Sequence, residues 1–181
     1  MRKGEPNLAL RRTNDYVLAG DEVWVDVSTL AHPAVVAIID FCDLSRVCDG
    51  QGRWVAIRIP NSKTLYVARK SRSVYLHRHI LNYSQRDPRV DHKNGDGLDN
   101  RKDNLRPATG SLNIANQGIK LYRSLPKGVS LRKDTGKYSA KIGVNGRTLH
   151  LGEFSNKNTA ALAYDAAARH YFGEFARTNY D

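Results

Sequence analysis

The sequence predicts an α+β protein: a small N-terminal β-rich region, a central strand–loop–strand–helix unit, and a C-terminal three-stranded antiparallel sheet packed on one helix. Three observations support this prediction. Short β-prone runs alternate with turn residues through the first 72 residues. Residues 138–151 alternate apolar and polar side chains around an Asn-Gly turn, and an alanine-rich run follows them. The predicted organisation is a β-rich region at 1–72, a central unit at 73–118, a linker at 119–126 and a C-terminal domain at 127–181.

The N-terminal region has four candidate strands, separated by turn sequences such as Asp49-Gly50 and Pro60-Asn61. They are 23–27, 35–40, 54–59 and 64–68. We expect a small, irregular, mostly antiparallel sheet. Nothing in this region demands a chemical role.

The central unit begins with the sequence VYLHRHILN, whose apolar residues fall near helical spacing. A strand at 89–92 follows, then a loop rich in Asn, Asp and Gly, and a returning strand at 104–106. Thr109 is a good N-cap for a short helix from Gly110 to about Asn116. His77 and His79 have two open interpretations: one of them supports the nearby site or contacts phosphate, or both pack the short helix on the hairpin.

The C-terminal domain has the clearest periodicity in the chain. Residues 138–144 place Tyr, Ala, Ile and Val at alternate positions, and Asn145-Gly146 is a strong hairpin signal. A returning strand at 148–151 and a third strand at 128–131 complete the sheet. The predicted helix is capped by Ser155, runs to about Phe172 and ends at Gly173.

One face of this sheet is expected to stay uncovered and to carry Arg132, Lys141, Arg147 and His150. A sheet of this size enters the major groove of DNA, where cations meet phosphates and guanine edges. Further candidate DNA contacts outside this face are Arg78, Arg101 and Lys127.

Charge favours a polyanionic partner. The 181 residues carry a formal net charge of +11, and residues 119–181 hold 11 Lys and Arg against 5 Asp and Glu. Nucleic acid fits better than a membrane, because no apolar run approaches the roughly 20 residues that span a bilayer. The first twelve residues lack the apolar core of a signal peptide, so a cytoplasmic protein is expected. Cys42 and Cys48 are expected to be buried thiols rather than metal ligands.

Residues 90–117, VDHKNGDGLDNRKDNLRPATGSLNIANQ, are the most informative for function. A hard cation prefers oxygen ligands, which Asp91 and Asn113 supply, and a hydrolytic water needs a base such as His92. An Asp-His pair beside Asn-Gly turns is, taken alone, usually a solvated loop. The hydrolytic interpretation therefore requires the side chains of residues 91, 92 and 113 to converge on a small pocket open to solvent.

Residues 75–117 resemble the His-Asn-His (HNH) nucleases, in the branch of phage and intron-encoded homing endonucleases. The resemblance is carried by YLHRHI, VDHKNGDGLDN, DNLRPAT and NIANQ. It implies the ββα-metal fold, with Asp91 as metal-binding carboxylate, His92 as general base, Asn104 as the residue that braces the loop and Asn113 as the final metal ligand. Many members have His at this last position, and Asn there points to Mg²⁺, with Mn²⁺ as an alternative.

Residues 127–181 are similar to the Apetala/ethylene-response-factor (AP2/ERF) DNA-binding domain. The matching stretches are KGVSLRKDTGKYSAKIGVNGRTLHLGEF and NTAALAYDAAARHYFGEFARTNY. Ser130 and Thr148 stand where the plant pattern has Arg, and His150 stands where it has Trp. Sequence preference is therefore not transferred.

The two resemblances together imply a homing-type DNA endonuclease that nicks double-stranded DNA as a monomer, without an obligate protein partner. A phage-infected bacterial host is the expected setting. The alternative is a DNA-binding regulator whose nuclease unit is degenerate or serves as a scaffold.

Overall fold

The computed structural model describes residues 13–60, 62, 64–69, 74–118 and 124–180. It is a mixed α+β structure with small sheets and few helices. The chain divides into two compact units, Met1–Arg106 and Pro107–Asp181. The predicted divisions at 72 and 118 do not coincide with this boundary. Of the predicted linker, residues 119–123 lie outside the described residues.

The N-terminal unit contains a three-stranded antiparallel sheet of β1 (Tyr16–Ala19), β2 (Glu22–Asp26) and β3 (Val36–Asp40). The sequence predicted β2 and β3 to within one residue at each end. It did not predict β1, whose four residues are all exposed at the sheet edge. An edge strand lacks the burial that produces a strong alternating pattern.

The second hairpin of this unit pairs β4 (Trp54–Arg58) with β5 (Leu65–Arg69). The short helices α1 (Leu44–Val47) and α2 (Leu76–Ile80) pack against each other. The core joins apolar side chains of the sheet and hairpin, and it also includes Val90 and Leu105. The β-rich region and the strands that follow it therefore share one core, which explains why no unit boundary falls at residue 72.

Strand β6 (Arg89–His92) pairs with β7 (Leu105–Ala108), and the loop between them lies along β3. The Ile38 amide donates to the Leu98 carbonyl at 2.9 Å, and the Asn100 amide donates to the Ile38 carbonyl at 2.7 Å. A 3₁₀ turn, η3 (Lys102–Asn104), leads into β7. Hydrogen bonds to β3 of the N-terminal sheet thus hold the polar loop in place.

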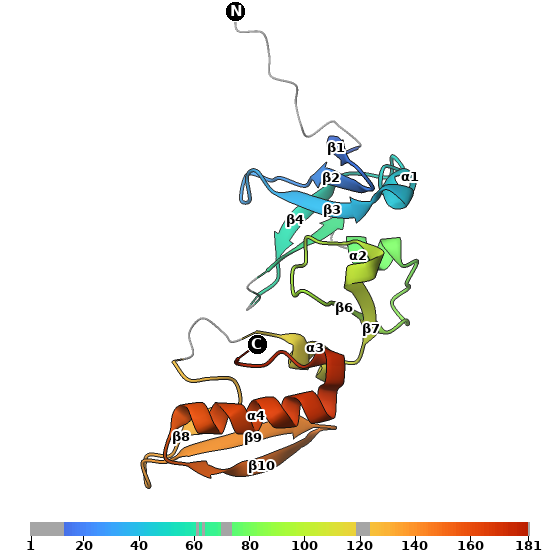
Figure 1. Ribbon diagram of the computed structural model, residues 1–181. Helices are drawn as coiled ribbons and strands as arrows, with labels where there is room; N and C mark the ends of the chain where they lie inside the picture. The colour runs from blue at the N-terminus through green and yellow to red at the C-terminus, as the bar shows by residue number, and fades with distance from the viewer. Residues whose placement is uncertain (1–12, 61, 63, 70–73, 119–123, 181) are drawn as a thin grey trace, which may run out of the picture. The chain divides into compact units, whose positions relative to one another are not determined.

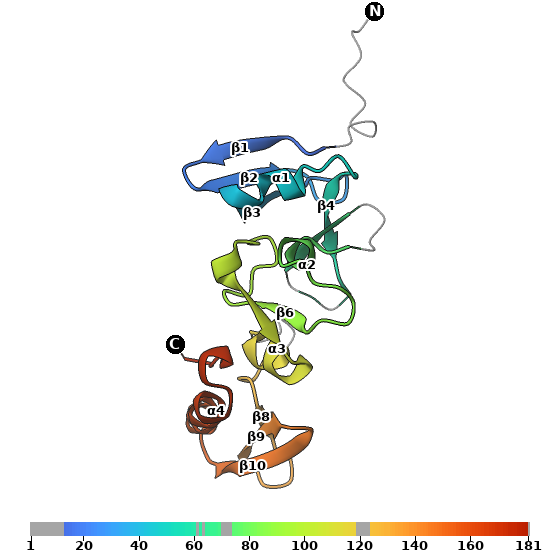
Figure 2. The same cartoon turned by 90° about the vertical axis from the view of Figure 1, so that its right-hand side faces the viewer.

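In the C-terminal unit, β8 (Val129–Leu131), β9 (Tyr138–Val144) and β10 (Arg147–Phe154) form an antiparallel sheet in the order β10-β9-β8. Helix α4 (Lys157–Phe172) lies across one face of this sheet (Figures 1 and 2). Small side chains such as Ala160, Ala161 and Ala168 are buried there and permit a close approach. The helix cap is Asn156, whose Oδ1 accepts from the Asn158 amide at 2.7 Å, rather than the predicted Ser155.

Helix α3 (Gly110–Asn116) has the predicted bounds and the predicted cap, because the Thr109 hydroxyl oxygen accepts from the Leu112 amide at 3.3 Å. Within the C-terminal unit it contacts α4 and the 3₁₀ turn η4 (Gly173–Phe175). The Arg177 amide also donates to the Ala115 carbonyl at 3.2 Å. The helix predicted to complete the central unit therefore packs as part of the C-terminal one.

None of the helices in the described part of the chain combines the length and apolar character needed to cross a membrane.

Candidate functional site

Asp91 and His92 are adjacent on β6, which places their side chains on opposite sides of the strand. Both are almost completely buried, with 4% and 5% of their surface exposed. Oδ2 of Asp91 accepts from Nε of Arg106 at 2.9 Å, in a buried ion pair between β6 and β7. The hydrolytic interpretation requires these two side chains to line a pocket open to solvent. In this structure they do not.

The imidazole of His92 is packed among aromatic and amide groups of the N-terminal unit. Its ring centroid lies 5.1 Å from that of His77 and 5.9 Å from that of Tyr66. Burial lowers the pKa of His92, against the opposing effects of a hydrogen bond with Asn100 and the charge of Asp91. The ring is therefore neutral at pH 7, which is the protonation state of a general base.

The two histidines of α2 are used in packing. The His77 ring stacks on Tyr75 at 5.5 Å, and burial, together with the nearby His92 and Arg78, lowers its pKa to about 3. The His79 ring lies 5.2 Å from Trp54, and its Nε2 is 3.0 Å from the Arg46 carbonyl. Both rings are thus packed within the N-terminal unit, and His77 lies directly against His92, so support of the site stays an open interpretation for His77.

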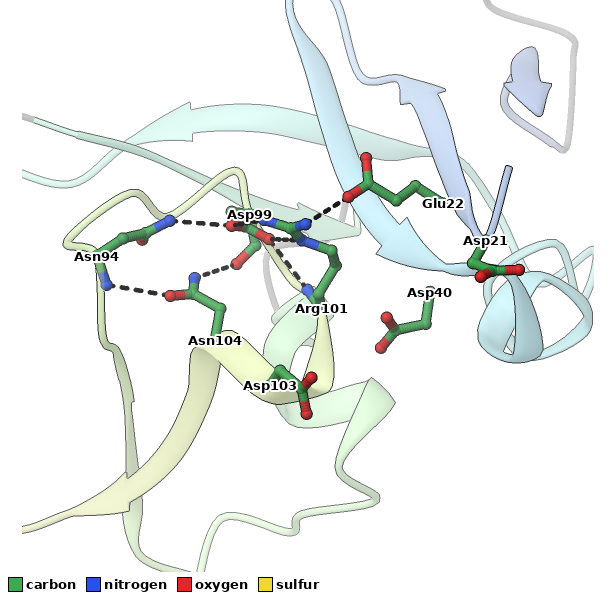
Figure 3. Close-up of a pocket in the computed structure, with 8 residues that line it drawn as sticks. All are labelled: Asp21, Glu22, Asp40, Asn94, Asp99, Arg101, Asp103 and Asn104. Atoms are coloured by element: carbon green, nitrogen blue, oxygen red, sulfur yellow. Dashed lines mark hydrogen bonds and ion pairs between the residues drawn. The ribbon is translucent and has the colours of Figure 1, made fainter. Parts of the chain in front are cut away.

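Asn104 connects the two ends of the polar loop. Its Oδ1 accepts from the Asn94 amide at 3.0 Å, and its Nδ2 donates to the Asp99 carbonyl at 2.8 Å. Asp99 in turn accepts hydrogen bonds from Nε and Nη2 of Arg101 at 2.9 and 2.8 Å, and these contacts lower the pKa of Asp99. Figure 3 shows this network as a closed set of hydrogen bonds.

The same loop borders an acidic pocket of about 470 Å³ in the N-terminal unit (Figure 3). Five of its lining residues are carboxylates, and the full set is Asp21, Glu22, Asp40, Asn94, Asp99, Arg101, Asp103 and Asn104. Arg101, a predicted phosphate contact, instead forms ion pairs with Asp99 and Glu22. Asp91 and His92 are not among the lining residues.

The predicted metal ligands offer oxygen donors. Asp91 supplies a carboxylate, but one of its oxygens already accepts from Arg106. Asn113 lies on α3, in the other compact unit, so its convergence with Asp91 stays a prediction. Over the described ranges, no three His, Cys, Asp or Glu side chains are grouped to hold a metal ion. Two oxygen donors of this kind fit Mg²⁺, which keeps several water ligands.

The strand register determines which residues of the C-terminal sheet lie on the face opposite α4. His150 lies opposite Lys141, Thr148 opposite Gly143, and Ser130 opposite Ser139. Nε2 of His150 is 3.2 Å from the Ser139 hydroxyl. Directly paired residues share a face, so these polar side chains lie on the face opposite the apolar Ala140 and Ile142, which pack toward α4.

Arg147 does not belong to this face. It lies opposite Val144 and has the same strand parity as Leu149, which packs in the core beneath α4. Because side chains alternate across a strand, Arg147 is on the helix side of the sheet. The expectation that Arg132, Lys141, Arg147 and His150 share one face is wrong for this residue.

Several predicted DNA-binding cations are engaged within the protein. Arg132 pairs with Asp134 at 2.5 Å and with Glu153 at 2.8 Å. Arg78 donates to backbone carbonyls of Ser84, Pro88 and Asp87. The Lys127 ammonium is bonded to carbonyls at the end of α3. Lys141, in contrast, is exposed on the uncovered face.

The comparisons with known proteins bear on the C-terminal part of the chain. No family model matches the sequence. The chain is 36% identical over 74 residues to the AP2-like ethylene-responsive transcription factor At1g16060 of Arabidopsis thaliana, and 37% identical over 73 residues to AIL5 of the same plant. These matches cover 40% and 39% of this chain, but only 21% and 13% of the relatives. They support an AP2-like C-terminal domain and do not bear on the nuclease resemblance.

Proposed function

We propose that the protein binds double-stranded DNA through the uncovered face of β8–β10 and hydrolyses a phosphodiester bond at the β6–β7 unit. DNA binding is supported by the net charge of +11, by the similarity to AP2-like transcription factors, and by a polar sheet face opposite the helix. This part of the proposal has the broader support.

The nuclease part depends on one observation, which is that Asp91 and His92 are neighbours on β6 and that burial lowers the pKa of the His92 imidazole, favouring the neutral form of a general base. The order of β6, β7 and α3 along the chain is the one that the nuclease resemblance implies, and Asn104 braces the loop between the two strands. In this mechanism, His92 takes a proton from the water that attacks phosphorus. Asp91 and Asn113 would hold Mg²⁺ or Mn²⁺, which when bound stabilises the charge that develops on the phosphate and the departing 3′ oxygen.

Burial sets a condition on this mechanism. A base accepts a proton from a water within hydrogen-bond reach, and His92 is only 5% exposed. The reaction therefore requires that DNA or metal binding uncovers the side chains of β6 and displaces Arg106 from Asp91.

The same burial favours a second candidate function, a DNA-binding regulator in which the β6–β7 unit is a scaffold. In that case the Asp91–Arg106 ion pair is a permanent structural contact. Both functions use the β8–β10 sheet to bind DNA. They differ only in whether the β6–β7 strand pair opens.

Relaxation of supercoiled plasmid in Mg²⁺ or Mn²⁺ separates the two functions. A nuclease with one catalytic set should produce nicked circles. His92→Ala should then lower the rate by roughly 10²- to 10⁴-fold, the usual contribution of a general base, while His32→Ala, in the loop between β2 and β3, should keep it. DNA binding without cleavage at any pH between about 6 and 9, the range in which a general base operates, would establish the regulator instead.

A further inference from the structure

Lys127 holds the end of helix α3. Its ammonium donates to the carbonyls of Ala115 at 2.5 Å and Gln117 at 2.8 Å, and more weakly to those of Ile114 and Arg177, each at 3.4 Å. Three of these four acceptors belong to the last turn of α3 or its C-cap. The side chain of Lys127, a predicted DNA contact, therefore forms these hydrogen bonds within the C-terminal unit.

This contact meets a physical need of the helix. The last carbonyls of any helix lack partners inside it, and they form the negative end of its dipole. An ammonium has three donors and a positive charge, so it can bond to these carbonyls and also compensate the negative end of the dipole. A helix of seven residues is too short to be stable alone, and its order depends on such tertiary contacts.

The backbone of Lys127 is fixed independently of its side chain. Its amide donates to Oδ1 of Asn179 at 2.6 Å, and its carbonyl accepts from Nδ2 of Asn179 at 3.2 Å. Asn179 is in turn bonded to Asp165 of α4, which is fully buried. Lys127 thus connects α3 to the α4 core through two sets of hydrogen bonds.

We propose that Lys127 is a positioning residue that fastens α3, and with it Asn113, to the DNA-binding unit. Asn113 is then carried by the unit that binds DNA, whereas Asp91 and His92 belong to the N-terminal one. Burial and the charge of Arg177 lower the pKa of Lys127 to about 8, so the ammonium is mostly protonated at pH 7 and holds the helix. The inference rests on the proposed function for the role of Asn113, but the attachment of α3 is testable without it.

Hydrogen exchange on the full-length chain tests the attachment. In Lys127→Met, the amides of Asn113 in α3 and of its C-cap Gln117 should exchange at least about tenfold faster, because charge-assisted hydrogen bonds are lost. The amides of β9 should keep their rates. Lys157→Met, an exposed lysine at the start of α4, is the matched control and should change neither.

Lys127→Arg keeps the charge and donors, and should retain most of the protection of α3. Unchanged α3 exchange in Lys127→Met, with the sheet folded, would overturn the proposal. If Lys127→Met does not fold, Lys127→Gln replaces it, and selective loss of α3 protection in this variant is again the required result.

Nicking and DNA affinity test the consequence for Asn113. Lys127→Met should bind DNA within about threefold of the wild type while requiring more Mg²⁺ for half-maximal nicking, as Asn113→Ala should. An unchanged Mg²⁺ requirement would refute the positioning of Asn113. A wild type that binds DNA but never nicks would refute the proposed nuclease, and the exchange result would then decide the attachment alone.

Discussion

The polar loop of the N-terminal unit and the sheet of the C-terminal unit use similar side chains in opposite ways. In the loop, Asn94, Asp99, Arg101 and Asn104 are hydrogen-bonded to one another, and Asp91 and His92 of β6 are buried. In the sheet, Lys141 is exposed on the face opposite α4, which none of the described helices and strands of its own unit covers. The difference teaches that a binding surface is available as folded, whereas a reaction at a closed site needs an opening step.

A second contrast concerns where positive charge is available. Arg101 and Arg132 are both compensated by carboxylates of their own unit. A guanidinium held in this way keeps a network in place and brings little net charge to a phosphate. The excess of basic residues in the last third of the chain therefore overstates how much charge the sheet face presents.

The largest expected effect is a loss of stability in the C-terminal unit. Gly128 has φ +78°, and a Cβ there would lie 1.9 Å from the Tyr164 ring. Gly128→Ala should destabilise this unit by about 3 kcal/mol or more, through backbone strain and overpacking. Circular dichroism at 222 nm measures it, because α4 is the longest helix described. Gly136→Ala has a similar φ but open space, so a loss as large as that of Gly128→Ala would contradict the packing argument.

The next effect is a dependence of the stability of the N-terminal unit on pH, which tests whether its histidines are buried. The folded pKa of His77 is about 3, below its ordinary value of 6.5, so the unfolded chain binds more protons between these values. Stability is then full above 6.5 and falls as the pH is lowered toward 3, with a loss of about 2 kcal/mol at pH 5. Both tryptophans, Trp24 and Trp54, are in this unit, so urea unfolding followed by their fluorescence measures it. His77→Phe should remove part of the acid sensitivity, and an unchanged pH dependence would show that the ring is not buried in solution.

A smaller effect distinguishes a structural cation from a binding one. Arg101→Ala leaves Asp99 buried without its main partner and should lower the stability of the N-terminal unit by about 1–2 kcal/mol. DNA affinity should stay within about twofold, since the guanidinium is already paired. Tryptophan fluorescence and a gel-shift titration measure the two quantities. A large loss of affinity with normal stability would instead show that Arg101 contacts phosphate.

The smallest effect concerns the open face. Lys141→Ala should weaken DNA binding a few-fold and lower the slope of log K against log salt by about 1, because one phosphate contact is lost. Titrations between about 50 and 200 mM salt measure this slope. Arg147→Ala removes the same charge from the helix side of the sheet and should have the weaker effect. A stronger effect from Arg147 would show that DNA approaches another face.

Local elements could be predicted because their signals are contained in a few neighbouring residues. The β9–β10 hairpin follows from alternation around Asn145-Gly146, and α3 begins after a Thr cap, as the structure has them. The position of Arg147 on the helix side also follows from a local signal, because its parity with Leu149 is visible in the sequence. Strand β1 was missed because its exposed residues give no burial pattern.

The chain by itself determined the α+β class, most strand and helix bounds, and the basic character that favours DNA, since these depend on local pattern and composition. Tertiary structure decided that Lys127 caps α3, that Arg101 joins Glu22, and that His92 is buried. Each of these depends on partners many residues away, which no local spacing specifies. Access to Asp91 and His92, and thus the choice between nuclease and scaffold, is likewise a property of packing.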